Sequence, residues 1–341
     1  MDKLTVYSQS DIDNLIMYRD GETKLGERVK IYRHVEEDSL SKTAISSVEL
    51  LKIDAKFVLL GIPEDVGVRA NEGIAGASTT WKSALMAFLN IQSNRFLSGE
   101  EILVLGHFEI DDPEDSSVAG LRNKVADIDD LVYPVIEKIV SAGKIPIVIG
   151  GGHNNAFPII KGTSLAKKQA IDVLNIDAHA DLRTQEGRHS GNGFTYALAE
   201  NYLADYHMYG LHQNYNNEAI VKEIETNSKL NAVFFDDILK GTDAQDFIAK
   251  IDSIAGLEID LDCIQNVLSS AETPSGFAVN EIRKLILTCG KKFSYFHISE
   301  GATRLLDGRV SKLTSKLVAY LVSDFVKAQA KIVPADLGDV R

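Results

Sequence analysis

Short apolar runs that alternate with helical segments constrain the fold of this 341-residue chain more than any other feature. Eight such runs are rich in Val, Ile, Leu and Phe, as strands covered on both faces of a sheet require. They span Lys56–Ile62, Glu101–Gly106, Lys144–Gly150, Ile171–Asp177, Tyr206–Leu211, Asn231–Asp236, Gly256–Asp262 and Lys292–Ser299. Alternation of strands with helices favours right-handed βαβ units and therefore a parallel sheet.

Apolar residues at helical spacing fill the intervals between these runs. One stripe covers Val125–Val140 and stops before Gly143, a residue suited to a helix C-cap. Pro134 interrupts this stripe and is expected to kink it. A second stripe covers Leu313–Phe325.

We therefore expect an α/β protein in which a three-layer α/β/α domain over residues 56–341 contains a central, mostly parallel sheet of about eight strands. The sequence has no internal repeat, low-complexity segment or Pro/Gly linker. Residues 1–55 are charged and contain no clear strand, so we expect a helical N-terminal extension packed on this domain.

Composition excludes several classes of partner. The hydrophobic content of 45% is that of an ordinary globular chain, and the net charge of −13 argues against nucleic acid or an anionic membrane as the main partner. Two cysteines, Cys263 and Cys289, make no disulfide framework. The first residues are polar and acidic, and no apolar run approaches the roughly 20 residues of a membrane helix. We expect a soluble cytoplasmic protein.

Three of the predicted strands lead into residues that bind metals in other proteins. The apolar parts of these three strands lead into Gly150–His153 (GGGH), Asp177–Asp181 (DAHAD) and Asp260–Asp262 (DLD). Ligands of such sheets bind beyond the carboxyl ends of the strands, and alternate side chains of an extended segment share one face. The candidate metal ligands are His153, Asp177, His179, Asp181, Asp260 and Asp262.

This ligand set indicates two divalent metal ions. Four carboxylates gathered in a buried site would repel one another, and two divalent cations would cancel their charge. Mixed nitrogen and oxygen ligands suit Mn²⁺, Fe²⁺, Co²⁺, Ni²⁺ or Zn²⁺ more than Ca²⁺ or Mg²⁺. Each motif alone has a structural interpretation, such as a His after a Gly-rich turn, but all three at strand ends favour a metal site. The missing Lys-Ser/Thr after the glycines argues against a P-loop.

The three motifs together resemble those of the arginase/agmatinase/formimidoylglutamase (ureohydrolase) superfamily. That family carries Gly-Gly-x-His, Asp-x-His-x-Asp and Asp-x-Asp in the same order, and the likeness extends from about Lys56 to the C-terminus. The resemblance implies a binuclear, usually manganese, hydrolase, often a homo-oligomer with three or six subunits. A hydroxide held between the two ions would attack an amidine or guanidine carbon.

The resemblance also implies a role for each ligand. Asp177 and Asp260 would bridge the two metals. The remaining ligands would be His153 and Asp181 on one ion, and His179 and Asp262 on the other.

Two carboxylates are candidate catalytic residues. Asp181 would hydrogen-bond the hydroxide and transfer its proton to the leaving nitrogen. Glu300 follows the last apolar run and matches the family's substrate-facing Glu, where a carboxylate offers paired acceptors to a planar amidinium. The family's Asn-Pro after this Glu is absent here, and a surface Glu after a strand is the alternative interpretation.

Departures from the arginase pattern bear on the substrate. The segment Gly61–Ala77 and the GGGH motif look most like the formimidoylglutamase branch. Arg183 occupies the position of an arginase Asn that contacts the substrate, and Tyr215 that of an Asp that binds its α-amino group. Phe194 replaces the arginase proton-relay His, unless His189 substitutes for it. Arginine is therefore a poor candidate.

We expect Arg183 and Arg69 to hold the carboxylates of N-formimidoyl-L-glutamate through charge-assisted contacts, with Ser190 and Asn192 on the rim of the site. Arg69 has an alternative role in a structural ion pair with Asp65. The expected reaction yields L-glutamate and formamide, a step in histidine breakdown. An agmatinase-, guanidinobutyrase- or arginase-like hydrolase is the alternative, because the Thr-Pro expected after HSGNGF is missing.

Two further classes remain open at the level of sequence. A binuclear phosphoesterase needs the same ligands and additional Arg, Lys or Asn side chains for phosphate, for which only Arg183 and Asn192 are available. A non-catalytic oligomer that kept its metal site is the other.

Overall fold

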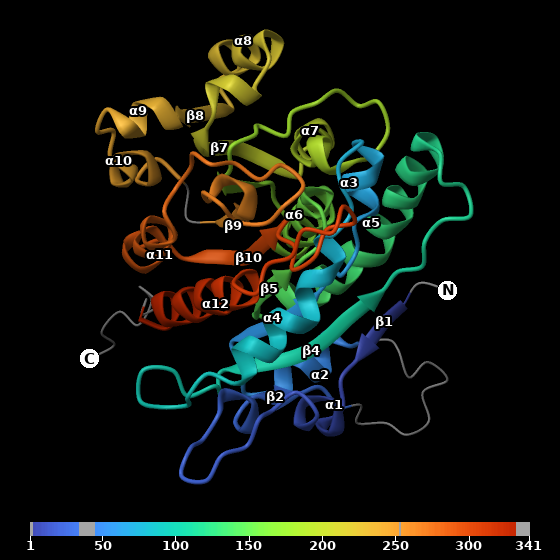
Figure 1. The fold of residues 1–341 in the computed structure, drawn as a ribbon, viewed down its shortest axis with the longest axis vertical. Coiled ribbons are helices and arrows are strands. Elements are labelled where there is room, and N and C mark those ends of the chain that lie inside the picture. Colours follow the sequence, from blue (N-terminus) through green and yellow to red (C-terminus); the bar gives the residue numbers. More distant parts are fainter. Residues whose placement is uncertain (1–2, 34–44, 252–253, 332–341) are drawn as a thin grey trace.

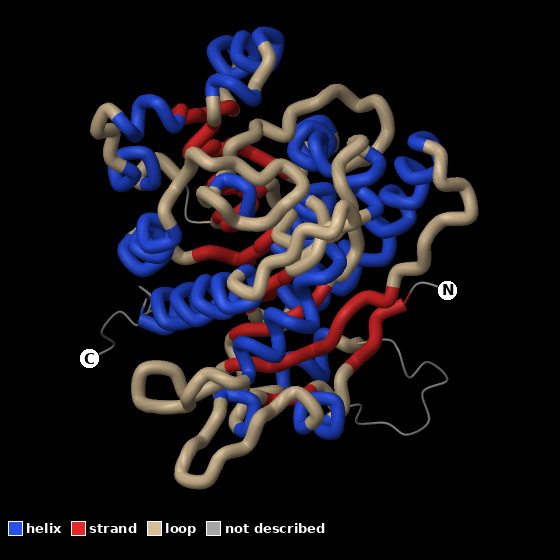
Figure 2. The backbone as a smooth tube through the Cα atoms, viewed as in Figure 1, coloured by secondary structure: helices blue, strands red, loops and turns tan. Residues whose placement is uncertain are grey.

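A ten-stranded sheet forms the centre of the protein in a computed structural model that describes residues 3–33, 45–251 and 254–331 (Figure 2). Its order is β1-β4-β3-β5-β10-β9-β6-β7-β8, with β2 beside β4. The strands are Lys3–Val6 (β1), Lys30–Ile31 (β2), Phe57–Gly61 (β3), Ile102–Glu109 (β4), Ile145–Ile149 (β5), Ile171–Ile176 (β6), Leu203–Leu211 (β7), Leu230–Phe234 (β8), Ala255–Asp260 (β9) and Phe293–Ser299 (β10). All pairings in this sheet are parallel except that of β1 with β4.

Helices cover both faces of the sheet (Figure 1). On one face α5 packs against α6, and on the other α4 and α11 pack against α12. The helices are Gln9–Asp13 (α1), Ser47–Lys52 (α2), Val66–Ala70 (α3), Thr80–Leu89 (α4), Val118–Ser141 (α5), Ala156–Lys167 (α6), Gly193–Ala199 (α7), Glu218–Thr226 (α8), Phe235–Leu239 (α9), Ala244–Ile248 (α10), Val279–Thr288 (α11) and Thr314–Lys331 (α12). Among the described residues, none of these helices combines the length and apolarity that crossing a bilayer requires.

The predicted three-layer α/β fold is confirmed. Each of the eight predicted runs forms a strand, and all but the edge strand β8 are largely buried because helices cover both faces. The predicted stripe Val125–Val140 lies within α5, and Pro134 is inside that helix and does not end it. Gly143 follows the helix with a φ of 72°, the left-handed conformation expected after a C-cap.

The prediction of a strand-free, helical extension over residues 1–55 is wrong in one respect. Besides short helices, this segment contains β1, which pairs antiparallel with β4, and β2, which pairs parallel with it. The N-terminal segment therefore completes one edge of the sheet. Residues 34–44 of the predicted extension lie outside the described residues, as do residues 332–341 of the predicted domain.

The strand order fixes where the candidate ligands meet. β5, β10, β9 and β6 are consecutive neighbours in the middle of the sheet and run parallel. The carboxyl ends of all four strands therefore open on the same edge of the sheet, where such folds bind ligands.

Candidate metal centre and substrate pocket

The chain after β5 reaches the site through a tight glycine turn. Gly150 and Gly151 have φ values of 89° and 80°, which favour glycine. A Cβ on Gly151 would lie 2.2 Å from Nδ2 of Asn155. Glu64, which sequence reasoning missed, is buried below the turn and accepts hydrogen bonds from the backbone N–H of Gly152 (3.0 Å) and from Asn155 Nδ2 (2.6 Å). The glycines thus allow the tight turn that places His153.

One group of predicted ligands surrounds the ring of His153. Its Nδ1 lies 3.1 Å from Asp177 Oδ2, 2.9 Å from Asp181 Oδ2 and 3.2 Å from Asp260 Oδ2. Among the described residues, Nδ1 has no partner in hydrogen-bonding geometry, although three carboxylate oxygens are this close. The four side chains form a group that can hold a metal ion.

A second group shares Asp177 with the first. His179 Nδ1 lies 3.1 Å from Asp262 Oδ2 and 3.6 Å from Asp177 Oδ1, and these three residues also form a group able to hold an ion. Asp177 is the residue common to both groups, as a bridging ligand must be. Asp260 belongs to the first group only, and its Oδ1 accepts a hydrogen bond from the backbone N–H of Asp262 (2.9 Å). Its bridging role stays a prediction.

The acids of this cluster are costly to ionise without a cation. Burial raises the pKa of Asp262 and His179 lowers it, and the resulting pKa is about 6. Burial and the charge of Asp262 raise the pKa of Asp260 well above its usual range, and burial raises that of Asp181. Oδ1 of Asp262 is buried with no hydrogen-bond partner in the described part of the chain. Divalent cations fit this donor set because they would compensate the charge and use the open lone pairs.

Burial lowers the pKa of the His153 imidazole, whereas it raises the pKa of the neighbouring acids. Asp177, Asp181 and Asp260 outweigh the effect of burial on His153, so that its pKa lies well above its usual value. Such mutual stabilisation of imidazole and carboxylates keeps the ligands together.

A buried pair behind His153 was not predicted. Glu258 Oε2 lies 2.6 Å from His297 Nδ1 and 3.6 Å from His153 Nε2, and all three side chains are almost completely buried. Burial raises the pKa of Glu258, but His297 and His153 lower it by a larger amount. The net pKa of Glu258 is about 2, below its usual value. Glu258 precedes Asp260 by two residues and so shares its face of β9, which is the sequence signal that could have revealed it.

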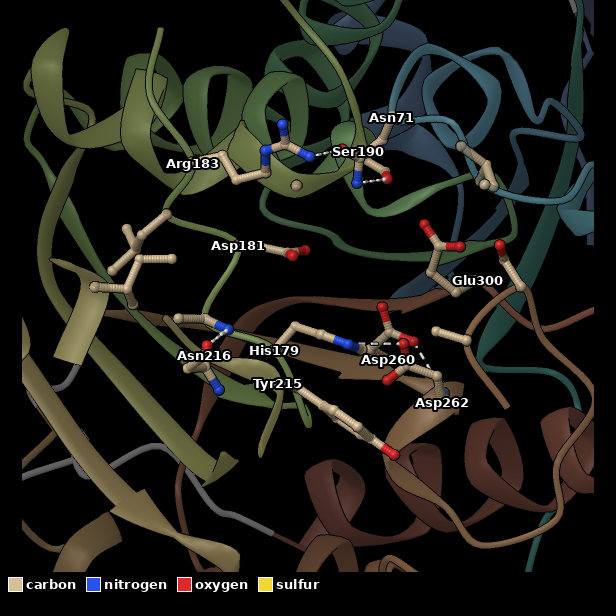
Figure 3. A pocket seen from close by; sticks show the side chains of 18 of the residues that line it. Asn71, His179, Asp181, Arg183, Ser190, Tyr215, Asn216, Asp260, Asp262 and Glu300 are labelled. Carbon is tan, nitrogen blue, oxygen red and sulfur yellow. Dashed lines mark hydrogen bonds and ion pairs between the residues drawn. The ribbon is translucent and has the colours of Figure 1, made fainter. Parts of the chain in front are cut away.

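A cavity of about 410 Å³ lies over the second group (Figure 3). Of the predicted site residues, it is lined by His179, Asp181, Arg183, Ser190, Asp260, Asp262 and Glu300. Sequence reasoning did not propose Asn71, Asn216 and Ser270, which also line it. Tyr215, noted only as a departure from arginases, lines the cavity and stacks on the ring of His179 at 5.2 Å.

Two carboxylates of the cavity sit on unusual backbone. Asp181 and Glu300 have φ values of 51° and 60°, a left-handed conformation that is uncommon for residues other than glycine and often found at functional sites. Oε1 of Glu300 accepts a hydrogen bond from the backbone N–H of His153 at 2.9 Å. Burial and the charge of Asp260 raise the pKa of Glu300 well above its usual range. A cationic ligand would relieve this cost.

The opposite wall of the cavity carries the guanidinium of Arg183 (Figure 3). Nη1 of Arg183 donates to Asn71 Oδ1 (2.7 Å), and Nη2 lies 2.9 Å from Glu186 Oε1. Nδ2 of Asn71 in turn donates to Ser190 Oγ (3.3 Å). The side chain of Arg183 is 49% exposed, so it can reach a ligand in the cavity.

Asn192 does not line the cavity, contrary to the prediction. Its Oδ1 accepts a hydrogen bond from Arg188 Nη1 (2.8 Å), and its Nδ2 donates to the carbonyl of Gly187 (2.8 Å). Asn192 is completely buried, and these contacts occupy its amide. It is a structural residue of the loop before α7.

Arg69 likewise does not line the cavity, and it forms the structural ion pair with Asp65 that was its alternative role. Its guanidinium lies 3.1 Å from Asp65 and contacts Asp112. Its guanidinium is therefore occupied by one acid at the start of α3 and another that follows β4.

His189 cannot replace the relay histidine from its position here. Its Nδ1 accepts a hydrogen bond from the backbone N–H of Gly191 (3.1 Å), and its Nε2 lies 3.2 Å from Glu186. The ring is buried and does not line the cavity. Phe194, at the relay position, packs edge-on against His153 at 5.1 Å.

Comparison with known proteins agrees with this geometry. The model of the Arginase family matches residues 55–326. A formimidoylglutamase of Macrococcus caseolyticus is 29% identical over 275 residues, which cover 77% of this chain and 83% of that protein.

Solved structures share the fold at lower identity. The formimidoylglutamase from Bacillus subtilis has a TM-score of 0.71 and 17% identity, covering 93% of this chain and 95% of that one. The Trypanosoma cruzi formiminoglutamase with Mn²⁺ has a TM-score of 0.67 and 20% identity, covering 91% and 99%. With the family match extending over most of its length, the chain belongs to the arginase family.

Proposed function

We propose that the protein hydrolyses N-formimidoyl-L-glutamate to L-glutamate and formamide with two divalent metal ions, most suitably Mn²⁺. Members of its family with this similarity hydrolyse C–N bonds of linear amidines, and the chain is an enzyme of this class. The specific substrate and metal are the proposal. The observation that carries it is the pair of ligand groups joined at Asp177 beside a cavity with Glu300 and Arg183 on its walls.

The proposed ligands are those of the two groups. His153, Asp181 and Asp260 would hold one ion and His179 and Asp262 the other, with Asp177 shared between them. When bound, the cations would lower the pKa of water and orient it toward the amidine carbon. The manganese pair in the Trypanosoma cruzi formiminoglutamase structure supports this choice of metal.

The chain's own side chains would orient the substrate. The carboxylate of Glu300 would accept hydrogen bonds from the cationic amidinium. Asp181, also in the cavity wall, would take a proton from the attacking water and give it to the leaving nitrogen of glutamate. Water adds to the amidine carbon, the bond from that carbon to the glutamate nitrogen breaks, and formamide leaves.

Arg183 would select an acidic substrate. Its partner Glu186 is exposed, and an exposed ion pair is weak enough for a substrate carboxylate to displace it. Asn71 is hydrogen-bonded to both Arg183 and Ser190. Together, Asn71 and Ser190 would add hydrogen-bond donors on the same wall. This wall disfavours agmatine, whose tail is cationic at the corresponding end.

A substrate panel tests the proposal. The Mn²⁺-loaded protein is assayed with N-formimidoyl-L-glutamate, arginine, agmatine, guanidinobutyrate and guanidinopropionate, and formamide and urea are quantified separately. We expect the highest kcat/KM for N-formimidoyl-L-glutamate, with formamide as product. If urea is released faster from a guanidino compound, that compound is the substrate and the alternative guanidino hydrolase activity is the correct one.

A further inference from the structure

Another group of side chains that could hold a metal ion lies at the opposite end of the strands from the proposed catalytic centre. Asp172 is the second residue of β6, and Asp205 and His207 are in β7. One ligand atom from each of the three lies within 4.8 Å of the others. Five residues of extended chain, about 16 Å, separate Asp172 from Asp177, so the two sites are distinct.

An irregularity in strand pairing brings these side chains together. Ile171 pairs with Leu203, but Val173 pairs with Tyr206, so β7 contains one extra residue at this point. Such a bulge redirects a side chain. The backbone N–H of Asp205 consequently donates to Asp172 Oδ1 at 3.2 Å, and the side chains of both strands meet on one face.

His207 points into this group without a hydrogen-bond partner. Its side chain is 2% exposed, and neither ring nitrogen forms a hydrogen bond with any described residue. Nε2 lies 3.7 Å from Asp172 Oδ2, beyond hydrogen-bonding distance. Phe247 of α10 packs edge-on against the ring at 5.9 Å and covers it with apolar surface. A buried imidazole in this state lacks the partner that its nitrogens require.

We propose that Asp172, Asp205 and His207 bind a divalent first-row transition metal ion. One imidazole and two carboxylates suit Zn²⁺ or Mn²⁺. The separation of 3.7 Å is near the roughly 3.0–3.4 Å between adjacent ligands on a shell of radius about 2.0–2.2 Å, so a small side-chain rotation closes the site. Asp205 is only partly buried, which leaves room for water to complete the coordination.

The ion would link β6 to β7 and play no part in the proposed reaction. It lies at the amino ends of the strands, whereas the cavity lies at their carboxyl ends. The inference is therefore independent of which amidine the enzyme hydrolyses.

Anomalous scattering at the Zn edge tests the site directly. Crystals of the full chain are equilibrated with Zn²⁺, and the same protein is analysed for bound metal after desalting. We expect an anomalous peak between His207 and Asp172 in the unaltered protein, and one bound ion per chain fewer in His207→Gln and in Asp205→Asn. Asp246→Asn, which removes an exposed acid on α10, is the matched control and should keep the ion.

Two outcomes would overturn the proposal: no peak at this group in the unaltered protein, or a peak and metal content that stay unchanged in Asp205→Asn. Asp205 is only partly buried, so Asp205→Asn decides the question even if His207→Gln does not fold. Retained amidine hydrolysis in Asp205→Asn would show in addition that the catalytic centre is separate.

Discussion

At the scale of single residues, regular spacing decided which site residues could be predicted. The strand-end motifs identified all six candidate ligands, and the structure brings them into two groups. The extended chain assumed for the motifs is wrong, because bends follow β6 at residues 178–179 and Asp262 lies in a short 3-10 helix after β9. Glu64 and Asn71 were not predicted because each stands alone in its segment and approaches the site only through the fold. Asn192 was wrongly assigned, since its loop folds back and its amide bonds the loop itself.

The role of Arg183 leads to a kinetic prediction. Arg183→Ala should raise KM for N-formimidoyl-L-glutamate by about 10–100-fold, because a hydrogen bond to a charged group contributes roughly 1.5–3 kcal/mol. Steady-state kinetics on this substrate and on an uncharged formamidine provide the measurement. KM for the uncharged compound should change little, and equal increases for both would remove Arg183 from carboxylate recognition.

The environment of His189 predicts a pH dependence of stability. Burial, followed by the charges of Arg183 and Arg122, lowers its pKa from 6.5 to about 4. The folded state therefore keeps this ring neutral while the unfolded chain binds a proton, so stability falls as the pH drops from about 6.5 to 4 and then levels off. Chemical unfolding between pH 7 and 4 should show a loss on the order of 1 kcal/mol, allowing for solvent screening, that is absent in His189→Gln. Parallel curves for the two proteins would contradict this assignment.

At the scale of elements, burial explains which strands could be predicted. The seven strands from β4 to β7 in the sheet order have near-continuous apolar sequences because helices cover both faces, and the predicted edge strand β8 is apolar although only partly buried. In β1, Lys3 is exposed and Thr5 and Val6 are only partly buried, and β2 has two residues, so neither produces a clear pattern. The shape of the edge of the sheet thus depends on long-range pairing with β4, which local sequence does not encode.

The pairing of β9 with β10 predicts a positioning role for Glu258. Glu258 and His297 are direct partners in the register of these strands, and the carboxylate faces His153 Nε2. A carboxylate behind a metal-binding imidazole fixes its orientation and raises its basicity. Glu258→Gln should weaken Mn²⁺ binding at one of two sites by about 10–100-fold, as measured by titration followed with electron paramagnetic resonance.

Glu225→Gln on the exposed surface of α8 is the matched control for this change. It should bind both ions normally. If Glu258→Gln also bound both ions with unchanged affinity, the carboxylate would have no influence on the metal, whatever its effect on stability.

At the scale of the whole molecule, the strand order assembles the centre from distant parts of the chain. Ligands come from the ends of β5, β6 and β9, with Glu300 after β10 between them in the sheet. The sequence showed the ligands and their strands but not this adjacency, which is set by crossover connections. Assembly into a trimer or hexamer stays a prediction, for which sedimentation equilibrium is the measurement.

Because three strands contribute ligands, metal removal should destabilise the entire sheet. Ions that bind only the folded state stabilise it by about 2.7 kcal/mol each at one hundred times their Kd, so two ions contribute about 5 kcal/mol. Without them, Asp260 and Glu300 stay buried as costly acids. Calorimetry before and after chelation should therefore show a Tm lower by several degrees, recovered on addition of Mn²⁺.

In Asp177→Asn, which removes the shared ligand, the chelator should have a much smaller effect and turnover should be lost. An unaltered protein whose Tm is the same with and without chelator would contradict a metal-linked sheet, and normal turnover of Asp177→Asn would exclude Asp177 as the shared ligand.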